Sequence, residues 1–330
     1  MAKTVNAAFG EFLSQHVNLD SSETAKARMS RDWLLRQISL FPDKYSDFPK
    51  LYTDINIHYG SFARRTKIRE LDDLDMVVGI SALGIEYIED GNTVYLSVPD
   101  GIALRAFCYE KKPYLNSRRV INKFVRHLSD VPQYNKADIK RDGMAAVLDL
   151  TSYAWSFDIV PGFFTTPEVD GRQYYIIPNG KGHWMKTDPR VDQERTRNIN
   201  QMHDGKVLNV LRTIKYWNRR ATMPNMSSYL IECMVLEYYS NKSNMSQYVD
   251  VELEPLLLYI SNAVLSSIQD PKRIQGDINN ISWEERQKIS AQAYDDSIKA
   301  NRARFAEDNG NHQVSINVWR QIFGDNFPKY

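Results

Sequence analysis

The sequence predicts a protein of mixed α and β class whose first half alternates strands with helices and whose second half is mainly helical. Up to about residue 188, short β-favouring runs bounded by Gly and Asp alternate with helical patterns. Beyond that point the strand signal fades, and apolar residues recur every three or four positions. The first half is compatible with an α+β or an α/β lobe. We expect two domains, residues 1–188 and residues 189–330.

The expected elements follow in chain order. An amphipathic helix is predicted over residues 21–40, where charged residues separate the apolar positions. The expected strands lie at 55–59, 76–80, 93–98, 145–150 and 157–160. A helix is predicted at 117–128, because its apolar residues fall on one helical face. Further helices are expected at 204–220, 227–241, 253–268 and 283–305.

Composition excludes several classes of protein. Across 330 residues, 42 Lys and Arg oppose 41 Asp and Glu, and the net charge of +1 excludes a globally basic nucleic-acid coat or a polybasic membrane anchor. The two cysteines, Cys108 and Cys233, are too few for a zinc-binding cluster and are expected as buried free thiols. Neither a secretory leader nor an apolar run long enough to span a bilayer is evident, so we expect a soluble cytoplasmic protein.

The motif with most chemical information lies at residues 59–80 and reads YGSFARRTKIRELDDLDMVVGI. On a strand, residues two apart face the same side, so Asp73 and Asp75 would project together while Leu74 faces the core. Adjacent carboxylates repel each other unless a cation lies between them. Hard oxygen ligands suit Mg²⁺ or Mn²⁺. The motif therefore predicts a metal site that leaves coordination positions for water and phosphates.

Upstream of the two aspartates, a Gly-Ser pair offers groups that suit a phosphate. Gly60 has no Cβ, so the backbone can approach a ligand closely. Ser61 would donate its hydroxyl and amide from the start of a helix, where an anion is favoured. Phosphate donors beside metal ligands are the working parts of phosphoryl or nucleotidyl transfer.

The pattern G-S-x₁₁-D-h-D, with h apolar, resembles the signature of the polymerase-beta-type nucleotidyltransferases. Within this superfamily the chain most resembles the cGAS/DncV-like nucleotidyltransferases (CD-NTases), which serve the bacterial anti-phage signalling systems called CBASS. The resemblance implies an α+β fold, with a mixed-sheet catalytic lobe and a helical C-terminal lobe. It also implies a third metal-binding carboxylate before an I-V-P sequence, which is Asp158 here. Asp149, on the preceding apolar run, is the competing candidate.

The resemblance extends into the helical half. The stretch LRTIKYWN at 211–218 is similar to the helix whose lysine contacts the donor triphosphate, which implies that role for Lys215. The stretch SSYLIE at 227–232 is similar to the family's S-Y-h-h-E helix start. By that match, Ser228 binds the terminal phosphate and Tyr229 offers a surface for base stacking.

The resemblance implies an enzyme that uses two Mg²⁺ ions, or Mn²⁺, to join NTPs, ATP among them, into a cyclic di- or trinucleotide with release of pyrophosphate. The product would activate a separate effector of the same system, and some members await an activating partner protein or ligand. Two cysteines cannot build the zinc-binding insertion of the animal DNA sensor, so direct activation by DNA is not implied. Two alternatives stay open: template-independent nucleotide addition to RNA or protein, and an inactive nucleotide-binding module.

Overall fold

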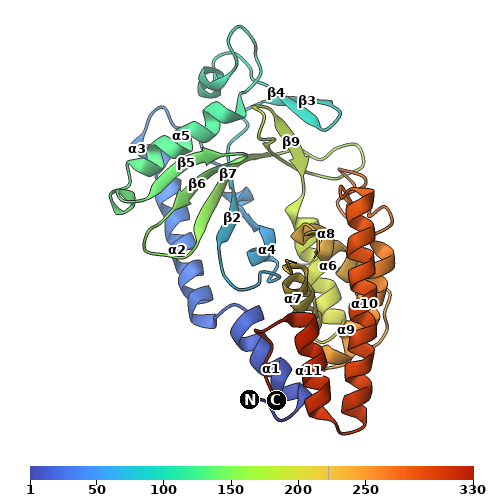
Figure 1. Ribbon diagram of the computed structural model, residues 1–330. Coiled ribbons are helices and arrows are strands. Elements are labelled where there is room, and N and C mark those ends of the chain that lie inside the picture. Colours follow the sequence, from blue (N-terminus) through green and yellow to red (C-terminus); the bar gives the residue numbers. More distant parts are fainter. Residues whose placement is uncertain (222) are drawn as a thin grey trace. The chain divides into compact units, whose positions relative to one another are not determined.

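The computed structural model describes residues 1–221 and 223–330, which fall into two compact units (Figure 1). We call them the sheet unit, Ser21–Ala63 with Leu71–Arg190, and the helical unit, Met1–Asp20 with Arg64–Glu70 and Val191–Tyr330. The chain therefore leaves the sheet unit for seven residues between the Gly-Ser pair and the two aspartates. The expected domain division at residue 188 stays a prediction.

A nine-stranded mixed sheet forms the centre of the sheet unit. Its strands are β1 (Ile57–Tyr59), β2 (Asp73–Gly79), β3 (Glu86–Asp90), β4 (Thr93–Ser97), β5 (Asp138–Asp142), β6 (Ala145–Asp149), β7 (Ser156–Phe164), β8 (Tyr175–Pro178) and β9 (Trp184–Thr187). They follow the order β1-β2-β7-β8-β9-β4-β3, and β6 pairs with both β5 and β7. Among the described strands, β2 and β7 alone pair in parallel, and the other ladders are antiparallel. The expected mixed sheet is confirmed.

Helices of the sheet unit are α2 (Ser21–Ser39), α3 (Phe41–Lys44), α4 (Gly60–Ala63) and α5 (Ser117–Ser129), with 3-10 turns at Thr53–Ile55, Ala103–Phe107 and Pro132–Tyr134. The side chain of Asn116 caps α5 by accepting from the amides of Arg118 and Arg119. The apolar face of α5 lies against β5, β6 and β7. In α2 the buried residues are Ala27, Leu34 and Ile38, whereas Met29, one of the apolar residues within the predicted helix 21–40, is 64% exposed.

The helical unit contains α1 (Val5–Phe12), a π-helical turn at Leu13–Val17, and most of α6 (Pro189–Met202). The remaining helices are α7 (Val207–Asn218), α8 (Ser228–Ser240), α9 (Val249–Ala263), α10 (Trp283–Asp308) and α11 (His312–Phe323). The Ser282 hydroxyl accepts from the amide of Glu285, whose carboxylate accepts in return from the Ser282 amide, and this capping box begins α10. The expected mainly helical part is confirmed.

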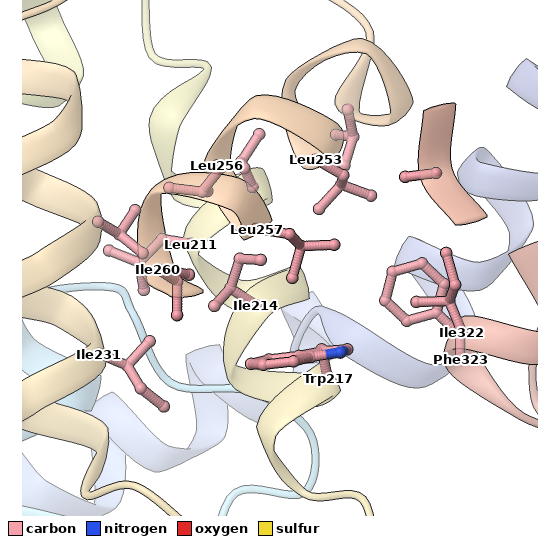
Figure 2. Close-up of a cluster of buried hydrophobic side chains, with 14 of the residues drawn as sticks. Leu211, Ile214, Trp217, Ile231, Leu253, Leu256, Leu257, Ile260, Ile322 and Phe323 are labelled. Atoms are coloured by element: carbon pink, nitrogen blue, oxygen red, sulfur yellow. The ribbon is translucent and has the colours of Figure 1, made fainter. Parts of the chain in front are cut away.

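The core of the helical unit is built by apolar side chains from helices that are distant in sequence (Figure 2). Trp217 of α7 and Leu257 of α9 are fully buried, as is Ile322 of α11. The indole nitrogen of Trp217 donates to a carboxylate oxygen of Asp296 on α10, 2.9 Å away. This core fixes the positions of α7 and α8, which carry the sequence-predicted residues of the second half.

Both cysteines are free and buried, as expected. Among the described residues, no helix is long and apolar enough to cross a bilayer.

Candidate active site

The predicted carboxylates lie on the two strands of the parallel ladder. In the β2–β7 register Asp73 lies opposite Ser156, and Asp75 lies opposite Asp158. Residues that face each other across a ladder project from the same side of the sheet. Asp73, Asp75 and Asp158 therefore share one face, while Leu74 and Phe157 are buried on the other. The shared face continues into an apolar cluster that includes Val77 and Val160.

The competing carboxylate, Asp149, has a different surrounding. It lies at the end of β6, opposite Ser156 on one side and Asp138 on the other. The whole of β7 separates it from β2, and its side chain is exposed. Neighbouring strands are about 4.8 Å apart, so Asp158 is one strand spacing from β2 and Asp149 is two. This geometry favours Asp158 as the partner of Asp75.

Two separate observations explain why position 60 requires glycine. Its φ is +71°, in the left-handed region that side chains with a Cβ rarely adopt. A Cβ built on Gly60 would also lie 1.7 Å from Oδ2 of Asp75 and 2.6 Å from its Cγ. The Gly60 backbone therefore lies directly against the carboxylate of Asp75.

Ser61 is half-buried in α4, directly after Gly60. The helix α4 has only four residues and contacts β2. A helix this short has little macrodipole, so its hydroxyl and amide donors are what Ser61 can offer an anion.

Tyr59 is a site residue that our reading of the sequence missed. It ends β1 directly opposite Asp75. Burial raises the pKa of Tyr59 well above its usual value, and the negative charges of Asp75, Asp158 and Asp73 raise it further. All three predicted carboxylates thus act on one phenol. Its position next to Gly60 in the motif was the available signal.

The donor set fits a magnesium ion in its chemistry and its placement. Three carboxylates on one face of two neighbouring strands offer the hard oxygen ligands that Mg²⁺ prefers. Within residues 1–221 and 223–330, however, no group of three or more His, Cys, Asp or Glu side chains is already gathered around a point that could hold a metal.

Lys215 is buried in the helical unit, with only 4% of its side chain exposed. Its ammonium donates to Oε1 of Glu232 and to the carbonyl oxygen of Thr66, each at 3.0 Å. From the sequence we predicted that Lys215 contacts a triphosphate, and we did not predict its bonds to Glu232 and Thr66. Glu232 was part of the quoted motif, but we gave it no role.

The other two predicted residues lie at the start of α8. Ser227 caps the helix by accepting from the Leu230 amide, and Ser228 follows as an exposed first residue. The Tyr229 hydroxyl donates to Oδ1 of Asp192, 2.8 Å away, and Lys272 lies over its ring, 4.1 Å from the centroid. One part of the ring is thus occupied by a cation of the helical unit itself. The expected roles of Ser228 and Tyr229 stay predictions.

Comparison with known proteins gives a consistent result. No protein-family model matches the chain. The chain is 43% identical to the probable cyclic nucleotide synthase of Bacillus cereus strain VD146 over 335 residues, which span 100% of this chain and 99% of that protein. It is 23% identical to the cyclic AMP-AMP-AMP synthase of an Acinetobacter species over 168 residues, 48% of each.

Solved structures show the same fold. The structure of CdnC from E. coli MS115-1 with ATP has a TM-score of 0.71 at 18% identity and covers 98% of both chains. The complex of that CdnC with HORMA-deltaN gives a TM-score of 0.70 at 17% identity, again with 98% of both chains covered.

Proposed function

The chain belongs to the CD-NTases and is a nucleotidyltransferase of the cyclic nucleotide synthase type, and from this premise we propose that it is a Mg²⁺-dependent enzyme of anti-phage defence that makes a cyclic di- or trinucleotide from NTPs with release of pyrophosphate. The observation that carries the proposal is the β2–β7 register. It sets Asp75, whose carboxylate lies against the Gly60 backbone, opposite Asp158 and puts Asp73 on the same face.

Asp73, Asp75 and Asp158 would hold the metal ions. When bound, Mg²⁺ supplies positive charge that favours ionisation of the acceptor ribose hydroxyl and stabilises the leaving pyrophosphate. A carboxylate oxygen of Asp158 takes the proton of that hydroxyl. Gly60 keeps the backbone close to the Asp75 carboxylate, and Ser61 donates to a phosphate oxygen.

Residues of the helical unit complete the proposed set. Lys215 and Ser228 are proposed to contact the triphosphate, and Tyr229 to offer part of its ring to a base. These roles rest on the match to the family motif. The ammonium of Lys215 has a fixed position, since it donates to two oxygen atoms of the helical unit.

We infer the proposed partners from those present in the solved structures of similar proteins. CdnC has been solved with ATP and with a HORMA protein, so we propose ATP among the substrates and an activating protein of comparable kind. The product would bind a separate effector. We propose that the enzyme acts in the cytoplasm.

The test is to incubate the purified protein with labelled NTPs in all combinations, with Mg²⁺ or Mn²⁺, in the presence and absence of a candidate partner protein. We expect release of pyrophosphate and a small labelled product that resists phosphatase, and we expect neither from Asp75→Asn. A labelled RNA or protein would instead indicate nucleotide addition to a macromolecule. Nucleotide binding without pyrophosphate release under every condition would indicate a binding module and contradict the proposal.

A further inference from the structure

Glu232 of α8 is a buried carboxylate, 2% exposed, that holds together three separate parts of the helical unit. Its Oε2 accepts from Nε of Arg64 at 2.8 Å. Its Oε1 accepts from the Thr66 hydroxyl at 2.8 Å and from the Lys215 ammonium at 3.0 Å. Lys215 in turn donates to the Thr66 carbonyl oxygen. Both carboxylate oxygens are thus bonded to donors of the segment 64–70 or of α7.

Three parts of the helical unit meet at Glu232: the segment 64–70, α7 and α8. Each of them carries or adjoins a residue that is proposed to contact a phosphate. Arg64 follows Ser61 by three positions in the chain. Ser228 lies one helical turn before Glu232, and residues four apart on a helix share one face. Lys215 is a direct partner. A substitution at Glu232 would therefore disturb the groups proposed to bind phosphate without removing any of them.

We infer that Glu232 is a positioning residue for triphosphate binding: its carboxylate holds the ammonium of Lys215 in place and keeps it charged, and anchors the segment that follows the Gly-Ser pair through Arg64 and Thr66. The inference rests on the function proposed above. The contacts of Lys215 described here use two of the three N–H donors of its ammonium. The third is the one that would donate to a phosphate oxygen.

The charge of Lys215 depends on Glu232 for an electrostatic reason. Burial lowers the pKa of Lys215, and the positive charges of Arg64 and Lys67 lower it further. Glu232 acts in the opposite direction, through its charge and its hydrogen bond. Without the carboxylate, Lys215 would lose its proton at a lower pH. A neutral amine attracts a triphosphate far less than an ammonium does.

A matched control exists in the same unit. Glu252 of α9 is also 2% exposed, and its carboxylate accepts from Lys242 at 2.6 Å and from the Tyr239 hydroxyl at 3.2 Å. None of these groups belongs to the proposed site. Glu252→Gln therefore measures what the loss of a buried, cation-bonded carboxylate does to the helical unit in general.

The experiment measures the affinity of the full-length protein for α,β-methylene-ATP and for AMP between about pH 7 and about pH 10, with Mg²⁺ present. In Glu232→Gln we expect the affinity for the triphosphate to fall about tenfold at the alkaline end and less near neutrality, because each unit of pKa changes the charged fraction about tenfold. The affinity for AMP should stay the same. Glu232→Asp should restore part of the alkaline affinity, and Glu252→Gln should bind both ligands like the wild type.

A double-mutant cycle then asks whether Glu232 acts through Lys215. Once Lys215→Met has weakened triphosphate binding, adding Glu232→Gln should weaken it much less than it does in the wild type, because only the anchoring of Arg64 and Thr66 is then lost. Additive losses, equal losses for AMP and the triphosphate, or a pH profile in Glu232→Gln that matches the wild type would each overturn the inference. If Glu232→Gln does not fold, Glu232→Asp and Lys215→Met decide the matter, because wild-type affinity and pH profile in both would contradict it.

These outcomes differ from a failure of the proposed function. An enzyme that makes a cyclic product but binds triphosphate equally well in all the Glu232 variants would refute the positioning role alone. A wild-type protein that releases no pyrophosphate would refute the proposed function, and the binding measurements would still test the role of Glu232.

Discussion

Replacing Gly60 by alanine tests the geometry of the carboxylate site at one atom. The added Cβ would lie 1.7 Å from Oδ2 of Asp75, roughly half a normal contact distance, and 3.2 Å from the Cβ of the same side chain. The Gly60 side is backbone, so the carboxylate must give way by more than about 1 Å. A displacement of about 1 Å in a reacting group costs on the order of a hundredfold in rate.

Two effects are combined in this substitution and have to be separated. Alanine at a φ of +71° costs roughly 1–2 kcal/mol in conformational strain, whatever its surroundings. Gly84 provides the control, because its φ is +86° and a Cβ there meets nothing within 4 Å. We expect Gly60→Ala and Gly84→Ala to lose similar amounts of backbone stability, while only Gly60→Ala loses about a hundredfold in rate.

The assay follows pyrophosphate release at saturating NTP, and urea unfolding of both variants is measured alongside it. Gly60→Ala with more than about a third of the wild-type rate would refute the reasoning, since the carboxylate would then tolerate displacement. Equal losses of rate in Gly60→Ala and Gly84→Ala would attribute the effect to backbone strain and would also refute it.

Three further predictions concern carboxylates in different surroundings. Asp158→Asn should lower the rate of pyrophosphate release roughly a hundredfold or more, whereas Asp149→Asn, two strand spacings from β2, should stay close to wild type; the reverse result would exchange their roles. Asp296→Ala should lower the free energy of unfolding by about 3 kcal/mol in urea titrations, because it removes the acceptor of the Trp217 indole N–H and the ion-pair partner of Arg220 and Lys299. A loss below about 1 kcal/mol would contradict this. For Asp270, burial acts to raise the pKa, but the hydrogen bond and charge of Lys272 outweigh it and hold the pKa below 3.8. A carboxyl whose pKa is lowered by folding adds stability above its unfolded pKa and loses it as the pH falls, so the urea midpoint should drop less between about pH 7 and about pH 3 in Asp270→Asn than in the wild type.

The strongly patterned elements could be predicted from the sequence. The helix at 117–128 is α5 with one residue added, because its apolar residues repeat at helical spacing and Asn116 provides a cap. Four strands were missed. Tyr175–Pro178 and Trp184–Thr187 have only four residues each, and the other two lack a complete pattern. Glu86–Asp90 and Asp138–Asp142 are mostly exposed and pair on one side only, so they carry few apolar residues. Pro189–Met202 was also missed, since few of its residues are apolar.

The candidate site also has parts that could be predicted from the sequence and parts that could not. The spacing in the 59–80 motif was enough to predict that Asp73 and Asp75 share a face, and the parallel register agrees with it. Local sequence does not show which strand becomes the neighbour of β2, so Asp149 and Asp158 could be ranked but not separated. The burial of Lys215 against Thr66 and Glu232 depends on residues far away in the chain, which helical periodicity does not reveal.

The parallel pairing of β2 with β7 also has a consequence for how the protein folds. A hairpin turn cannot join parallel strands, and here β3 to β6 and α5 all intervene between them in the chain. Closing such a long loop is entropically costly, and contacts distant in sequence form slowly. Asp75 therefore leaves the ribosome long before its neighbour Asp158 is synthesised. We expect the carboxylate face to be among the last parts of the sheet to form, so that a nascent or truncated chain ending before β7 has no nucleotidyltransferase activity.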